Sequence, residues 1–75
     1  MKNFGKVDVI LDDYMKKHKI SRNSLVRNAE IQYKQVKKYC DNDVQKFDLH
    51  ILAKICTALD CEITDILKLE KVKDE

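Results

Sequence analysis

The sequence predicts an all-α domain built from five helices. Three observations support this prediction: the 75 residues make one small domain, proline is absent, and glycine occurs once, at Gly5. A β sandwich or barrel of this length would need several tight turns with glycine or proline chemistry. Apolar residues instead recur at the spacing of a helix face. We expect the domain at residues 7–69, between an N-terminal arm at residues 1–6 and a charged C-terminal tail at residues 70–75.

The first two helices are predicted from apolar spacing and from residues suited to helix ends. Residues 7–18 begin with aspartates and end with lysines and a histidine, the order that the helix dipole favours. Their apolar face consists of Ile10, Leu11, Tyr14 and Met15. Residues 22–28 follow Ser21, a preferred N-cap residue. Their inward positions are Leu25, Val26 and Ala29.

The same pattern predicts three further helices. Residues 33–40 bury Val36, Tyr39 and Cys40 and end near Asn42, which tolerates the left-handed conformation. Asp48 caps a fourth helix that ends near Leu59. Its apolar stripe is Leu49, Leu52, Ala53, Cys56 and Leu59, widened by Ile51 and Ile55. A short fifth helix at residues 63–69 presents Ile63, Ile66 and Leu67.

Composition excludes several classes of protein. No apolar run exceeds three residues, so we expect neither a transmembrane span nor a signal-peptide core. The three cysteines, Cys40, Cys56 and Cys61, have no Cys-x-x-Cys spacing and indicate reduced thiols in a cytoplasmic protein. We expect the last two in the core and Cys40 partly exposed. His18 and His50 lack a second ligand at helical spacing, so we expect no bound metal.

Positive charge is concentrated in one third of the chain, although the net charge is only +2. Residues 14–38 contain eight lysines and arginines and a single acid, Glu30. The remaining residues carry seven cations and twelve acids. Such asymmetry indicates a surface for phosphate groups, or less often for an anionic membrane.

Two short helices joined by a tight turn, the second of them basic, form the pattern that indicates function. From Ile20 the chain reads I-S-R-N-S-L-V-R-N-A-E-I-Q-Y-K-Q-V-K-K-Y-C, and from Phe47 it reads F-D-L-H-I-L-A-K-I-C-T-A-L-D-C-E-I-T-D-I-L. Together these segments resemble the Cro/cI-type (XRE, lambda-repressor-like) helix-turn-helix family in its short single-domain form. The resemblance implies a compact five-helix DNA-binding domain that regulates transcription and reads the major groove with its third helix.

The family's positions map onto this chain with two departures. Leu25 takes a buried apolar position of the first motif helix, and Val36 and Tyr39 take those of the recognition helix. Val26 stands where the family usually has a small residue, so it is bulky at the close crossing of the two helices. Glu30 occupies the turn position usually held by glycine, where a positive φ costs roughly 1 kcal/mol.

The resemblance also indicates which residues contact DNA. Outward residues of the recognition helix would meet base edges in the groove: Gln32, Tyr33, Lys34, Lys37 and Lys38. Residues near the helix N-termini would contact phosphates: Ser21, Arg22, Asn23 and Gln35. The plainer interpretations are a solvated lysine face and, for Tyr33, a packing role at the surface.

The predicted function is sequence-specific binding of double-stranded DNA by a transcriptional regulator, more often a repressor in this family. Such proteins usually bind pseudo-palindromic operators as homodimers. The dimer contact is open between two regions: the fifth helix with the tail (Ile66, Leu69, Val72), and the arm (Phe4, Val7). We expect no cofactor and no small-molecule substrate.

A second hypothesis is a protein-interaction module, such as an antitoxin-like or phage accessory protein whose basic helix binds an acidic partner. Antitoxins within the resemblance also bind DNA, so the two hypotheses overlap. An enzyme is not expected, because the sequence has no glycine-rich phosphate loop, no carboxylate pair in an evident pocket and no Cys–His constellation.

Overall fold

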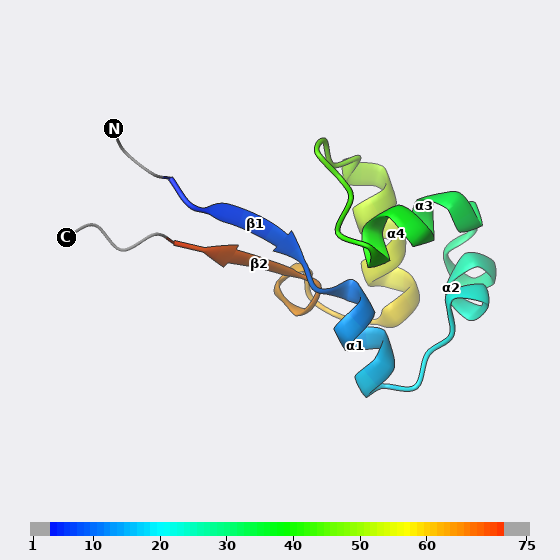
Figure 1. The fold of residues 1–75 in the computed structure, drawn as a ribbon. Coiled ribbons are helices and arrows are strands. Elements are labelled where there is room, and N and C mark those ends of the chain that lie inside the picture. The colour runs from blue at the N-terminus through cyan, green and yellow to red at the C-terminus, as the bar shows by residue number, and fades with distance from the viewer. Residues whose placement is uncertain (1–3, 72–75) are drawn as a thin grey trace.

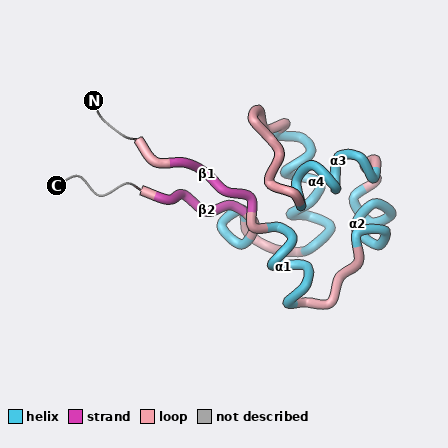
Figure 2. Tube along the Cα trace, in the orientation of Figure 1, coloured by secondary structure: helices cyan, strands magenta, loops and turns pink. Residues whose placement is uncertain are grey.

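Four helices and a two-stranded β-ribbon make up the fold in the computed structural model, which describes residues 4–71. The helices are α1 (Leu11–Lys17), α2 (Arg22–Ala29), α3 (Tyr33–Cys40) and α4 (Leu49–Leu59). The strands are β1 (Lys6–Val9) and β2 (Leu67–Glu70), with a 3-10 turn, η1 (Ile63–Asp65), before β2. The strands pair antiparallel and extend from one end of the helical body, away from α2 and α3 (Figure 1, Figure 2). No helix in residues 4–71 is long and apolar enough to span a membrane.

The core lies where the helices meet the root of the ribbon. Six side chains are enclosed almost completely: Leu11, Met15, Leu25, Val36, Ile55 and Ile66. They come from all four helices and from the residue before β2, so the helices and the root of the ribbon share one apolar cluster. Burial of each such side chain stabilises the fold by roughly 1.5–3 kcal/mol, which makes this cluster the main source of stability.

Three local predictions are confirmed at helix ends. Ser21 Oγ accepts a hydrogen bond from the amide of Ser24 at 3.0 Å and caps α2. Asp48 Oδ1 accepts from two amides in the first turn of α4. Asn42 takes the left-handed conformation after α3, with φ of 57°. Because these contacts satisfy backbone groups that a helix leaves unpaired, local sequence determines where α2 and α4 begin and where α3 ends.

The prediction of a purely α-helical, five-helix domain is wrong at both ends of the chain. Residues 7–9, predicted as the start of the first helix, lie in β1, and residues 67–69, predicted as the end of the fifth, lie in β2. Both segments alternate apolar and charged residues at the period of a strand. The two segments are far apart in sequence but pair with each other as antiparallel strands. The Ile10 amide donates to Ile66 O at 2.7 Å, and α1 begins only after this contact.

Several predicted burial states are also wrong. Leu49 is 80% exposed, because it lies about 120° around the axis of α4 from the buried Ile55. Ala53 is exposed for the same reason, at about 160° from Ile55. Cys40, expected partly exposed, is buried, with its sulfur 3.9 Å from that of Met15. The two remaining cysteines, expected in the core, are half-buried at its edge.

The apolar residues considered for a dimer contact differ in exposure. Ile66 is enclosed in the core and cannot contact a partner. Phe4, Leu69 and Val7 are 86%, 55% and 47% exposed. Val72 lies outside the described residues.

Gly5 is required by the geometry at the end of the ribbon. Its φ is 85°, and a side-chain carbon there would overlap the backbone carbonyl of Glu70. We therefore expect Gly5→Ala to destabilise the ribbon by about 1–2 kcal/mol, because an L-residue is strained at this φ. Amide hydrogen exchange measures the effect: exchange in β1 and β2 should accelerate while that in α2 and α3 stays slow. Unchanged exchange in the ribbon would show that Gly5 is replaceable.

Candidate nucleic-acid interface

α2, a short turn and α3 form a helix-turn-helix unit. α2 ends at Ala29, and the capping residue after it is Glu30, whose φ of 54° is left-handed and whose amide donates to Val26 O. Ile31 then turns into the core, 8% exposed, and Gln32 leads into α3. Glu30 thus adopts the positive φ that a glycine would take without strain. Burial of Ile31 offsets the conformational cost, which is roughly 1 kcal/mol.

The inner side of α3 is fixed by packing. Val36 and Tyr39 are 0% and 2% exposed. The Tyr39 hydroxyl accepts a hydrogen bond from the Asp48 amide at 3.3 Å, and its ring centroid lies 6.1 Å from that of Phe47. Rotation of α3 about its axis would break these contacts. The opposite side of α3 is therefore held in one orientation toward solvent.

The outer side of α3 carries cations and polar groups. All the predicted base-contact residues are exposed: Gln32, Tyr33, Lys34, Lys37 and Lys38. Of the predicted phosphate-contact residues, Ser21 and Asn23 are exposed, whereas Arg22 and Gln35 are half-buried. Both sets lie on α2 and α3 or at the residue that caps each helix, at the end of the molecule opposite the ribbon (Figure 1). Within residues 4–71, Lys34 and Lys38 form no ion pair, so their ammonium groups are available to an anionic ligand.

Comparison with known families agrees with this geometry. Residues 11–72 match the family model of the Cro/C1-type HTH DNA-binding domain. The chain belongs to the Cro/C1-type helix-turn-helix family. The match includes all four helices and β2, whereas β1 lies before it. A search of curated proteins found no match.

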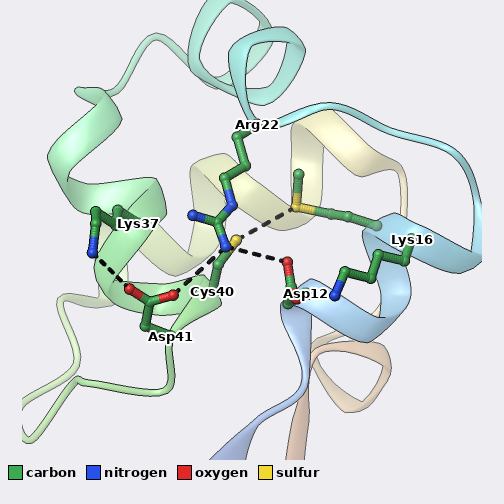
Figure 3. A network of polar contacts seen from close by, with 7 residues as sticks. Asp12, Lys16, Arg22, Lys37, Cys40 and Asp41 are labelled. Atoms are coloured by element: carbon green, nitrogen blue, oxygen red, sulfur yellow. Dashed lines mark hydrogen bonds and ion pairs between the residues drawn. The ribbon is translucent and has the colours of Figure 1, made fainter.

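In this Cro/C1-type domain, Arg22 and Lys37 bind carboxylates within the protein (Figure 3). Arg22 Nη2 lies 3.5 Å from Asp12 Oδ1 and 3.6 Å from Asp41 Oδ1, so it connects α1, α2 and the end of α3. Lys37 Nζ lies 2.9 Å from the second oxygen of Asp41, and Lys16 Nζ lies 3.0 Å from Asp12 Oδ2. These five residues, three cations around two carboxylates, form a network that we call the carboxylate network. It includes Lys37, one of the exposed lysines of α3. Two of the predicted DNA-contact residues thus have partners before DNA binds.

The carboxylate network shifts the acidity of its members. The hydrogen bond from Lys37 holds the pKa of Asp41 below its ordinary value of 3.8 and raises the pKa of Lys37 above 10.5. The hydrogen bond from Lys16 likewise lowers the pKa of Asp12. The prediction of contact residues from sequence missed both aspartates. The i,i+4 spacing of Lys37 and Asp41 in the sequence indicates that the two can form an ion pair. The contacts of Arg22 depend instead on how α1, α2 and α3 pack.

Asp41→Asn is expected to raise the affinity for duplex DNA of any sequence about threefold to tenfold. The substitution removes an anion beside the exposed lysines of α3, releases Lys37 to bind phosphate and leaves Arg22 with Asp12 as its one carboxylate partner among the described residues. An exposed ion pair contributes only about 0–1 kcal/mol to folding, so the domain should stay folded. Fluorescence anisotropy with a duplex of random sequence measures the change. Asp60→Asn, at the end of α4, is the control with the same change of charge. If both variants raise the affinity equally, the gain comes from the change in net charge and not from the position of Asp41 beside Lys37.

Proposed function

We propose that this chain is a sequence-specific transcriptional regulator that binds double-stranded DNA by inserting α3 into the major groove. The observation that supports this most strongly is the two-sided character of α3. Val36 and Tyr39 fix the helix from behind, while Lys34 and Lys38 extend into solvent without an ion pair among the described residues. A helix about 10–12 Å across fits a groove about 12 Å wide.

In this proposal the exposed residues of α3 read base edges. The ammonium groups of Lys34, Lys37 and Lys38 can donate to O6 and N7 of guanine, which lie in the major groove. The amide of Gln32 can pair with adenine, and the ring of Tyr33 can contact a thymine methyl group. Lys37 exchanges its contact with Asp41 for a contact with DNA. Lys34 needs no such exchange, so it is the side chain from which we expect the largest contribution to specificity.

Phosphate contacts set the position of α3 in the groove without reading sequence. Ser21 and Asn23 stand at the start of α2, where amides and short polar side chains can meet a phosphate oxygen. Gln35 lies in the first turn of α3 and can do the same. Arg22 contributes a phosphate contact only if the phosphate replaces one of its two carboxylate partners, Asp12 or Asp41.

The proposed assembly is a homodimer on a pseudo-palindromic operator, because one small helix-turn-helix buries too little surface for tight binding. The half-sites would lie about 34 Å apart, one turn of DNA. Repression is the proposed effect, since a protein bound across a promoter excludes the polymerase without a further contact surface. The cytoplasm is the proposed location, because it keeps three free cysteines reduced.

Selection of bound duplexes from a random pool tests the function. We expect enrichment of one palindromic consensus, with affinity that falls linearly on a logarithmic salt scale as lysines displace counterions. Sedimentation of the protein bound to the selected duplex counts the subunits. A pool without an enriched sequence, or an affinity that does not change with salt concentration, would overturn the proposal.

A further inference from the structure

The C-terminal end of α4 closes in a backbone turn that brings two cysteines together. The Cys61 amide donates to Cys56 O at 3.0 Å, and the Asp60 amide donates to Thr57 O at 3.3 Å. Asp60 itself is left-handed, with φ of 52°. Two such hydrogen bonds around a left-handed residue form a Schellman motif, in which the side chains of the first and last residues frequently come into contact. In this chain those two residues are Cys56 and Cys61.

The separation of the two cysteines suits a covalent bond between their sulfurs. Because the Cys61 amide nitrogen lies 3.0 Å from Cys56 O, standard bond lengths limit the distance between the two Cα atoms to about 7 Å. Disulfides join residues whose Cα atoms are about 4.4–6.8 Å apart. The pKa of the Cys61 thiol is raised to about 11, first by burial and then by the charge of Cys56 and a hydrogen bond with its side chain. The two thiols thus lie within reach of each other.

The third cysteine differs from this pair in its access to solvent. Cys56 and Cys61 are free thiols, half-buried at the edge of the core. Cys40 is only 8% exposed, and its sulfur lies 3.9 Å from the thioether of Met15. A small molecule can therefore reach the pair while the core stays closed, whereas it reaches Cys40 only when the core opens. Cys40 serves as an internal control for chemistry at the pair.

We propose that Cys56 and Cys61 form a thiol–disulfide exchange site whose reactant is a small-molecule disulfide. The thiolate of one cysteine attacks a sulfur of the small disulfide and releases one small thiol, which leaves a mixed disulfide on the protein. The thiolate of the other cysteine then attacks the protein sulfur of that bond and releases the second small thiol. The protein loses two electrons and two protons, and the small disulfide gains them as two thiols.

The new bond cross-links the end of α4 to the segment that leads into η1. A cross-link restricts the unfolded chain, and it also holds the turn closed when the end of the helix frays. A reducing compartment keeps the pair in its thiol form, so the bond forms only when the small thiols of that compartment are themselves oxidised. Neither cysteine lies in α2 or α3, so the surface proposed to bind DNA keeps all its residues.

Mass spectrometry of the full chain after incubation with oxidised glutathione tests the site. We expect the mass to fall by about 2 Da, the mark of one internal disulfide, and to return when dithiothreitol is added. Trypsin cleaves after lysine, so residues 55–68 contain both cysteines of the pair and residues 39–46 contain Cys40. The loss should lie wholly in the first peptide. A stable glutathione adduct, a disulfide between two chains, or a reaction at Cys40 in place of the pair would overturn the proposal.

Single cysteine variants test the two steps of the exchange. Cys56→Ser and Cys61→Ser each retain one thiol of the pair, so each should stop at the mixed disulfide and gain the mass of one glutathione. Cys40→Ala is the matched control, which keeps both thiols of the pair and should still lose about 2 Da. An internal disulfide in Cys56→Ser or Cys61→Ser would show that Cys40 takes part and would contradict the assigned pair.

Thermal unfolding of the oxidised and the reduced protein measures the effect of the bond. We expect the temperature of half-unfolding to be about 5 °C higher in the oxidised form, because the cross-link restricts the unfolded chain. Cys56→Ser given the same treatment should show no such rise. An oxidised form that is no more stable than the reduced form would contradict stabilisation by the cross-link. These assays contain no DNA, so the exchange site and the DNA-binding proposal can fail separately.

Discussion

Replacement of Lys34 by alanine is expected to weaken binding to the selected operator by about 1–3 kcal/mol, which is a factor between about 5 and about 150. Lys34 is exposed in the first turn of α3 and has no ion-pair partner in residues 4–71. Its loss therefore removes a donor to guanine without breaking a contact inside the protein. Fluorescence anisotropy with the selected duplex and with a scrambled duplex measures the loss and its specificity.

Lys6→Ala is the matched control for Lys34→Ala, because it removes the same charge from the ribbon at the far end of the molecule (Figure 1). Its side chain is 69% exposed. We expect a small, sequence-independent loss of affinity for Lys6→Ala and a loss confined mainly to the selected duplex for Lys34→Ala. Equal losses in the two variants would mean that Lys34 contributes charge alone and does not read bases.

Leu25→Ala is expected to destabilise the domain by about 2–5 kcal/mol, the usual cost of a cavity in a well-packed core. Leu25 is 0% exposed and lies in α2, where it meets the central cluster. A domain of this size rarely has more than about 3–5 kcal/mol of stability in total, so the variant should be largely unfolded at 25 °C. Urea unfolding followed by circular dichroism measures the change.

Leu49→Ala is the same substitution at a leucine that is 80% exposed. The change in stability should stay within about 0.5 kcal/mol, as for most surface substitutions. The pair of variants therefore compares one truncation inside the core with one outside it. Similar losses at both positions would contradict the burial of Leu25 or the exposure of Leu49.

The helix-turn-helix unit could be predicted because its determinants are local. The cap at Ser21, the turn at Glu30 and the buried pair of Val36 and Tyr39 all lie within a short stretch of chain. Their spacing alone indicates which side of α3 faces the core. The side that faces solvent, with its lysines, follows directly from the same periodicity.

The ribbon could not be predicted in the same way, because its strands are far apart in sequence. Val7 pairs with Leu69, and nothing near Val7 indicates that partner. Four alternating residues also fit the end of an amphipathic helix, so Asp8 together with Asp12 and Asp13 favours a longer first helix. The contacts of Arg22 with Asp12 and Asp41 were missed for a related reason, since they depend on the packing of three helices.

The most direct test of DNA binding by α3 is the change in amide chemical shifts when the labelled protein is titrated with its selected duplex. We expect the largest changes from Gln32 to Lys38 and at the start of α2, with the ribbon amides unchanged apart from dimer effects. The largest changes at β1, β2 or the end of α4, with α3 unaffected, would contradict insertion of α3 into the major groove.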